Sequence, residues 1–311
     1  METHDNLLYG SFNARYLSYV EVAESFIPSV QFEDLIKSES TLLMGPRGCG
    51  KTTLLKMLTI DGIKHTTHPV VKEIVERINF IGIYIPTDIQ WKNQFKYVSK
   101  HINDTSDQNF IFKAMVHLNV LVSLIRTFQR HLSHSIFDSN EVVRRENEIC
   151  RNICKFWELD IDDTSKNFGT IELLLLGALS QLNGEVNISV SKRLKTIEYE
   201  TLPRILFKDF VDLTRIAVRI YESSMGLDSE QKWALCFDEL ELLPKKQQMF
   251  IVSLLRSTDQ KLIYKITSTP VLGITDEVLA TPKNDFEPVK LWVYDSTGQS
   301  SWRAFCQEFT S

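Results

Sequence analysis

The sequence lacks several features that would define its class at once. No apolar run approaches the roughly 20 residues that cross a bilayer, because the longest, from Leu173 to Leu179, is short and contains a glycine. The first residues carry neither a basic segment nor an apolar segment of the kind found in secretory leaders. We therefore expect a protein of the cytoplasm with no membrane segment.

Cysteine and excess positive charge are also scarce. The five cysteines form an odd set scattered through apolar or helical text, which favours reduced buried thiols over a disulfide framework. The net charge of -5 argues against a strongly basic nucleic-acid-binding surface, although a local basic patch stays open. Repeats and low-complexity text are absent. The 311 residues suit about two globular domains.

One stretch carries a recognisable chemistry. Residues 45–52 read GPRGCGKT, a complete match to the phosphate-loop pattern G-x-x-x-x-G-K-[ST]. The apolar run Thr41–Met44 before it fits a buried strand, and helical text follows from Thr53. A strand, a glycine loop and a helix in this order direct backbone N–H groups at one point, as a triphosphate requires. The alternative is a chance glycine turn.

The loop residues have expected roles in binding ATP. Lys51 is expected to reach the β- and γ-phosphates and to act in catalysis, and the Thr52 hydroxyl to bind Mg²⁺. At Cys49 the cationic neighbours and the helix start favour the thiolate, because they lower the pKa of a thiol; the alternative is that a small residue is present there only because it fits. Alkylation of a Cys49 thiolate would be fast without nucleotide and slow with Mg-ATP. The predicted nucleotide-binding residues are Gly45, Pro46, Arg47, Gly48, Cys49, Gly50, Lys51, Thr52 and Thr53.

A second strand signal ends in two carboxylates. The apolar run Trp233–Phe237 leads directly into Asp238 and Glu239, the order typical of the second half of a P-loop ATPase site. We expect this strand to lie beside the loop strand. Asp238 is then expected to bind Mg²⁺, and Glu239 to orient and polarise the attacking water as a catalytic residue. A helix N-cap is the alternative interpretation.

Three further strands complete the predicted sheet, over residues 78–85, 262–266 and 289–294. Polar residues follow the second of them, and we expect Ser268 among them to sense the γ-phosphate as a catalytic residue. A plain turn before Pro270 is the alternative. A polar stretch is expected between the loop helix and Ile74, and a helix over residues 301–309.

A long segment with a helical sequence pattern separates the two halves of the predicted site. Apolar spacing predicts helices over 111–132, 141–159, 170–182 and 202–224, with Pro203 in the first turn of the last. This block is far longer than the ~2–6 residues of an ordinary strand-to-helix connection. We therefore predict an α/β fold, a parallel P-loop NTPase sheet flanked by helices with a large helical insertion. The predicted divisions are a lead-in at 1–39, a core at 40–90 and 226–311, and an insertion at 91–225.

Two clusters in the insertion suggest other chemistry. His131 with His134, and Cys150 with Cys154, contain metal-ligand types, but their spacing along a helix face favours core or surface residues over zinc. The arginines at 144, 145 and 151 are of the type that binds the phosphates of a nucleic acid. Their acidic neighbours favour a solvated helix face instead.

Five stretches taken together resemble one family. They read NARYLS at 13–18, EVA at 21–23, FIP at 26–28, LLMGPRGCGKTTLL at 42–55 and CFDELE at 236–241. With them the chain resembles the AAA+ ATPases, in a bacterial branch similar to origin-recognition-complex ATPases. The resemblance implies that Phe26, Ile27 and Pro28 border the adenine, and that Ser268 stands where the family usually keeps a sensor asparagine.

The chain departs from that family pattern in two places. The family usually places a trans-acting arginine before the last strand of the core, but no arginine occurs between Arg256 and Arg303; the cations closest to the last predicted strand in that part of the sequence are Lys283 and Lys290. The small helical lid is expected to be missing or to lie beyond residue 311. A signalling switch of the STAND type, with very slow turnover, is therefore the alternative to an ATPase.

The resemblance also implies partners. It indicates Mg²⁺-dependent ATP hydrolysis coupled to a conformational change in a protein partner or effector, in the setting of bacterial defence against phage. A homo-oligomer and nucleic-acid binding both stay open.

Overall fold

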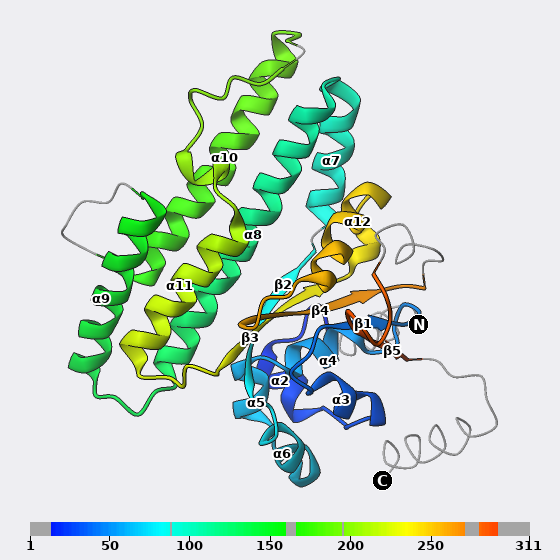
Figure 1. Ribbon diagram of the computed structural model, residues 1–311, viewed down its shortest axis with the longest axis vertical. Coiled ribbons are helices and arrows are strands. Elements are labelled where there is room, and N and C mark those ends of the chain that lie inside the picture. Colours follow the sequence, from blue (N-terminus) through cyan, green and yellow to red (C-terminus); the bar gives the residue numbers. More distant parts are fainter. Residues whose placement is uncertain (1–13, 88, 160–165, 195, 271–279, 292–311) are drawn as a thin grey trace, which may run out of the picture. The chain divides into compact units, whose positions relative to one another are not determined.

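The computed structural model describes residues 14–87, 89–159, 166–194, 196–270 and 280–291 (Figure 1). The chain divides into two compact units. The first, here called the sheet unit, comprises Met1–Thr87 and Gln231–Ser311, and the second, the helical unit, comprises Asp88–Glu230. The predicted core at 40–90 and 226–311 and the predicted insertion at 91–225 divide the chain near the same positions.

Among its described residues, the sheet unit has five parallel strands in the order β2-β3-β4-β1-β5. This confirms the predicted α/β class with a parallel sheet. The expectation that β3 lies beside the loop strand β1 is wrong, because β4 lies between them and pairs with both. The strands are Thr41–Met44 (β1), Phe80–Pro86 (β2), Lys232–Asp238 (β3), Leu262–Ser268 (β4) and Glu287–Lys290 (β5).

The helices of the sheet unit include two that the sequence pattern did not predict. The stretch interpreted as polar contains α5 and α6. Thr59 caps the first, since its hydroxyl accepts from the backbone N–H of Gly62, and Pro69 stands at the first position of the second. The helices are α2 (Tyr19–Glu24), α3 (Val30–Leu35), α4 (Lys51–Met57), α5 (Ile60–His65), α6 (Pro69–Val75) and α12 (Lys245–Ser253), with short 3₁₀ turns η2 (Leu240–Leu242) and η3 (Leu254–Arg256).

The lead-in helices belong to the core of this unit. Phe32 and Leu35 of α3 are fully buried and pack in one cluster with Leu55 of α4 and with Ala234 of β3. Each fully buried apolar side chain of this size contributes about 1.5–3 kcal/mol. The described part of the predicted lead-in therefore helps to fold the sheet unit. The predicted residues 292–294 of the last strand and the predicted helix 301–309 lie outside the described residues.

In its described residues, the helical unit contains long helices and one short 3₁₀ turn. The elements are α7 (Ile89–His101), α8 (Thr105–Ser133), α9 (Ser139–Trp157), α10 (Phe168–Ser191), the 3₁₀ turn η1 (Arg204–Phe207) and α11 (Phe210–Met225). Helix α8 packs against α10 and α11, and α9 packs against α11. By length and composition α8 could cross a membrane, but 78% of that window is buried inside the protein, as in the core helix of a bundle.

Helix boundaries in this unit differ from the predicted ones where caps decide them. The predicted helix from residue 202 is two elements. Pro203 precedes η1, and Asp209 caps α11 by accepting from the N–H groups of Val211 and Asp212. Helix α7 lies at the start of the block predicted to be helical, although no separate helix was predicted there, and α10 continues to Ser191 instead of ending near Leu182.

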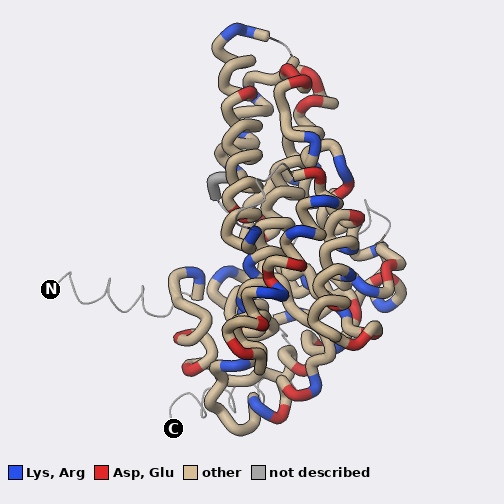
Figure 2. Tube along the Cα trace, turned by 90° about the vertical axis from the view of Figure 1, so that its left-hand side faces the viewer, with Lys and Arg blue, Asp and Glu red and all other residues tan. Residues whose placement is uncertain are grey.

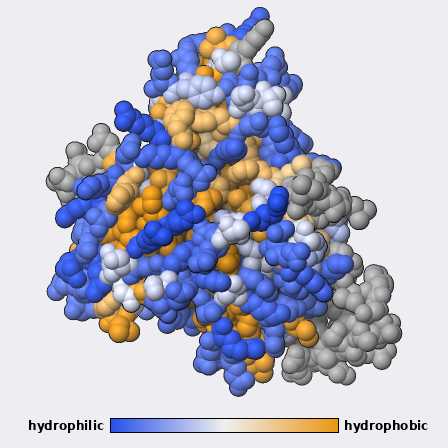
Figure 3. All heavy atoms as spheres, viewed as in Figure 1, coloured by the Kyte–Doolittle hydropathy of each residue, from blue (hydrophilic) through white to orange (hydrophobic). Residues whose placement is uncertain are grey.

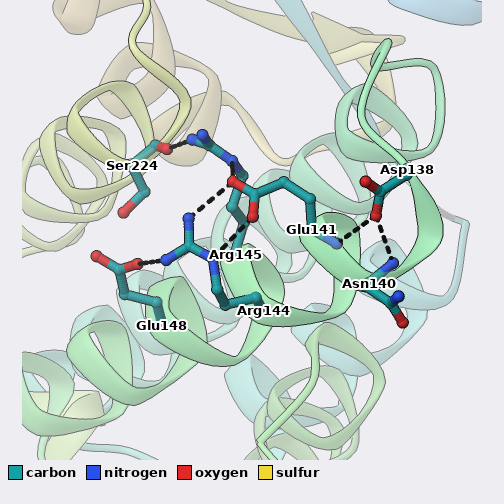
Figure 4. Close-up of polar contacts among 7 residues, drawn as sticks. All are labelled: Asp138, Asn140, Glu141, Arg144, Arg145, Glu148 and Ser224. Carbon is teal, nitrogen blue, oxygen red and sulfur yellow. Dashed lines mark hydrogen bonds and ion pairs between the residues drawn. The ribbon is translucent and has the colours of Figure 1, made fainter.

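Two arginines of α9, Arg144 and Arg145, are paired with carboxylates (Figure 4). Arg144 Nη2 lies 2.7 Å from Glu141 Oε1 and its Nη1 3.6 Å from Glu148 Oε2, while Arg145 Nε lies 2.6 Å from Glu141 Oε1. The hydrogen bonds from Arg144 and Arg145 lower the pKa of Glu141 to about 2. Arg145 also donates to the carbonyl of Ser224. This cluster agrees with the solvated helix face that the acidic neighbours favoured.

Charge and polarity are spread over the molecule. Lys and Arg are interspersed with Asp and Glu over the trace (Figure 2), and polar residues cover most of the face drawn in Figure 3, with apolar patches between them. The Nδ1 atom of His131 lies 2.8 Å from the Tyr221 hydroxyl, and Cys150 and Cys154 are buried. In the part of the chain that the structure describes, no three His, Cys, Asp or Glu side chains group as metal ligands would.

Candidate active site

The glycine-rich loop joins β1 to α4 in a turn that only glycine adopts easily. Gly48 and Gly50 have φ of 81° and 88°, in the left-handed region, and Gly50 is the N-cap residue that directly precedes α4. The sequence match therefore folds as a strand, a tight loop and a helix, in the order predicted.

Lys51 is buried directly beneath this loop. Its Nζ donates to the carbonyl of Gly45 at 2.7 Å and to that of Pro46 at 3.0 Å, and lies 3.9 Å from Glu241 Oε1. The second carboxylate oxygen of Glu241, Oε2, is buried and has no hydrogen-bond partner among the described residues. The loop thus holds the buried cation of Lys51 beside Glu241, whose Oε2 accepts no hydrogen bond from the described residues.

The two predicted metal residues come together from distant parts of the chain. Thr52 Oγ1 donates to Asp238 Oδ2 at 2.7 Å, and Asp238 is 2% exposed. The Tyr84 hydroxyl donates to the same oxygen at 2.9 Å. Burial and the charge of Asp238 raise the pKa of Tyr84, so this hydroxyl stays a donor. Hydroxyl and carboxylate oxygens are the hard ligands that Mg²⁺ prefers, so the residues present fit that ion.

Glu239 leaves the strand in a left-handed conformation, with φ of 54°. Its backbone N–H donates to Thr267 Oγ1 at 2.9 Å and to Asp238 Oδ1 at 3.0 Å, which fixes the turn. Its side chain points to Arg15, whose Nη1 lies 3.4 Å from Glu239 Oε2. Burial, and next Asp238, raise the pKa of Glu239, and Arg15 opposes them.

The position of β4 explains which polar residue reaches the carboxylates. Alternation along a strand puts Thr267 and Ser268 on opposite faces. Thr267 Oγ1 donates to Asp238 Oδ1 at 2.7 Å, whereas the Ser268 hydroxyl is buried without a hydrogen-bond partner among the described residues. The Ser268 carbonyl accepts from the N–H of Gly45 at 3.1 Å. The sequence pattern pointed to Ser268 and not to Thr267. The alternation of side chains along β4 could have indicated that Thr267 faces the carboxylates.

Replacing Thr267 by valine is expected to lower the free energy of unfolding by about 1–3 kcal/mol, because the buried Asp238 loses a donor and the N–H of Glu239 an acceptor. Denaturant titrations measure this change. The matched control is Thr214→Val, at a fully buried threonine whose hydroxyl has no partner among the described residues. An equal effect of both substitutions would show that the hydrogen bonds of Thr267 contribute nothing.

The expectation for Cys49 is wrong. Burial raises the pKa of the Cys49 thiol, and the charge of Lys51 lowers it by less than burial raises it. The sulfur packs against Gly45, where an added Cβ would collide with it. The thiol is therefore neutral and partly shielded without any nucleotide, and fast alkylation of the free protein is not expected.

The residues proposed to border adenine differ in exposure. Phe26 is buried and lies edge-on to Phe32, with ring centroids 4.9 Å apart. Ile27 and Pro28 are partly exposed. Of the three, only Ile27 and Pro28 offer surface to a base without rearrangement of the core.

Three further residues of the site carried no predicted role: Arg15, Tyr84 and Glu241. Arg15 and Glu241 lie in the stretches that resemble the family, but the resemblance assigned no chemical role to them. Tyr84 is an ordinary strand residue in the sequence, and only the pairing of β2 with β3 brings it to Asp238.

A family model described as ORC-CDC6-like matches residues 8–311. The chain belongs to the ORC-CDC6-like family. This membership agrees with the resemblance drawn from the motifs and implies a nucleotide-binding AAA+ ATPase that uses ATP and Mg²⁺. No curated protein and no solved structure matches the chain.

Proposed function

We propose that this ORC-CDC6-like protein binds ATP with Mg²⁺, hydrolyses it, and passes the change of nucleotide state to a protein partner. The observation that carries the proposal is the hydrogen bond between Thr52 and Asp238, at 2.7 Å. It joins a hydroxyl of the phosphate loop to a buried carboxylate at the end of β3, two oxygen ligands of the type that a magnesium-bound triphosphate needs.

Each residue of the site has a part in this proposal. Lys51 exchanges its contacts with the loop carbonyls for phosphate oxygens. Thr52 and Asp238 hold Mg²⁺, which when bound neutralises charge on those oxygens. Glu239 accepts a hydrogen bond from the attacking water and polarises it. Ser268, whose buried hydroxyl lacks a partner among the described residues, is the proposed γ-phosphate sensor.

The wider setting is proposed on the family alone. We propose a cytoplasmic protein that acts with a protein effector, or as a homo-oligomer, in bacterial defence against phage. Deleting the gene and challenging the cells with a broad panel of phage tests this setting, and unchanged susceptibility across the panel would count against it. Nucleic-acid binding stays an open alternative for the partner.

The second candidate is a STAND-type switch, in which bound nucleotide sets the conformation and turnover is very slow. The sequence favours it because no arginine occurs between Arg256 and Arg303, and a trans-acting arginine is worth about 10³–10⁵ in rate. The two candidates bind the same ligand and differ in whether the bound nucleotide is turned over repeatedly.

Kinetics with limiting and with excess Mg-ATP separate these candidates. We expect the isolated chain to release more than one equivalent of phosphate per chain, and chelation of Mg²⁺ by EDTA to abolish release. The Lys51→Ala variant controls for contaminating ATPases. Release that stops at one equivalent would support the switch, and no release under any condition would contradict hydrolysis by this chain.

A further inference from the structure

The segment before α2 is fixed to the helix that comes after the phosphate loop. Lys56 of α4 is buried, and its Nζ donates to the carbonyls of Ala14 and Leu17, both at 2.7 Å. At the other end, Ser18 and Glu21 form a reciprocal cap at the start of α2, with distances of 2.7 and 3.2 Å. The backbone that carries Arg15 is therefore held on both sides.

Arg15 projects from this fixed segment to the acidic end of β3. Its Nη1 lies 3.4 Å from Glu239 Oε2, with side-chain exposures of 37% and 31%. An ion pair this exposed contributes little to stability, because solvent screens it and two long side chains must be ordered. If the contact has a role, that role lies in the site and not in the fold.

The carboxylates at this end of the sheet are held by different partners. Asp238 accepts from Thr52, Tyr84 and Thr267, and its orientation is fixed by three hydroxyls. The backbone of Glu239 is fixed by Thr267, whereas its carboxylate is paired with Arg15. Arg15 is therefore the cation that the structure pairs directly with the carboxylate of Glu239, and the charge of Arg47 acts on the same group.

We propose that Arg15 is a positioning residue for Glu239, a cation from the chain's own N-terminal segment that holds this carboxylate in the orientation from which it acts on water. The inference rests on the proposed function of Glu239. Because Lys56 ties the same segment to α4, Arg15 links the position of Glu239 to the helix that carries the phosphate loop.

The test compares Arg15→Ala, Arg15→Lys and the double variant Arg15→Ala/Glu239→Gln. We expect Arg15→Ala to lower kcat by up to about 100-fold, the loss that misplacing a reacting group by about 1 Å produces, with the dissociation constant for a fluorescent ATP analogue unchanged. Arg15→Lys should restore part of the rate. In the Glu239→Gln background, Arg15→Ala should add no further loss, because the group through which it acts is gone.

Arg77→Ala is the matched control, since Arg77 Nη2 lies 3.4 Å from Glu33 Oε2 in another exposed pair of the same unit. It should leave kcat unchanged. A wild-type rate in Arg15→Ala, a faster rate, or an additive loss in the double variant would each overturn the positioning role. If the wild-type protein itself releases no phosphate, the proposed function fails first, and this inference with it.

Discussion

Replacing Glu239 by glutamine is expected to leave Mg-ATP bound and to lower turnover by ~10²–10⁴, the usual cost of losing a general base. Glutamine keeps the size and shape of the side chain but cannot accept the proton of the attacking water. The backbone N–H of residue 239 keeps its acceptors, Thr267 Oγ1 and Asp238 Oδ1, so the turn should survive. Single-turnover hydrolysis and equilibrium binding of nucleotide measure the two expectations separately.

Glu33→Gln is the matched control for this substitution, because Glu33 is an exposed glutamate of the same unit, also paired with an arginine. Its turnover should equal that of the wild-type protein. If Glu239→Gln hydrolyses ATP at the wild-type rate, Glu239 has no role as a base. If it no longer binds nucleotide, the residue acts in binding, and the assignment of Asp238 and Glu239 to separate roles is wrong.

The local parts of the site were predictable from the sequence. The phosphate loop, the strand before it and the acidic pair at the end of β3 each lie within a few consecutive residues, so their residue types alone indicate their chemistry. The match of the described strand Thr41–Met44 to the predicted one illustrates this.

Contacts between distant strands were not predictable. Parallel strands are joined by long connections, and nothing in a single strand says which neighbour it pairs with. The motif order therefore suggested β3 beside β1, whereas β4 lies between them. For the same reason the sequence did not predict the contact of Tyr84 with Asp238, which depends on the pairing of β2 with β3. It also did not predict the contact of Arg15 with Glu239, because these residues are far apart in the sequence.

Burial also overrides arguments from local charge. The cations around Cys49 suggested a thiolate, but the desolvation of the sulfur has the larger effect on its pKa. Sequence shows the neighbours of a residue along the chain, and it does not show how much water reaches the side chain.

Burial has a larger consequence at Lys265, in the middle of β4. This side chain is 0% exposed, and its Nζ donates to the carbonyl of Lys37 at 2.8 Å and to Thr41 Oγ1 at 2.9 Å. Burial lowers the pKa of Lys265 to about 7. The titratable groups that act on it are Cys236, Glu39, Lys37 and Lys232.

The free energy of unfolding is therefore expected to rise with pH between about 7 and 10. In the unfolded chain a lysine keeps its proton up to a pKa of about 10.4. In that window the unfolded chain binds more protons than the folded one, so stability increases, by at most about 1.4 kcal/mol per pH unit. Below about pH 7 both states are protonated, and the cost of the buried charge is fully present.

Replacing Lys265 by methionine, which has a similar length and no charge, should remove this rise. Cys150, Cys154 and Cys236 oppose it in both proteins, because burial raises the pKa of their thiols and stability then falls as pH rises. The decisive quantity is thus the difference in the free energy of unfolding between the wild-type protein and Lys265→Met. Urea titrations with reductant at about pH 7, 8 and 9 measure this difference. Hydrogen exchange in β1 and β4 identifies the unfolding of the sheet unit. Parallel pH profiles for the two proteins would mean that Lys265 has an ordinary pKa in the folded state.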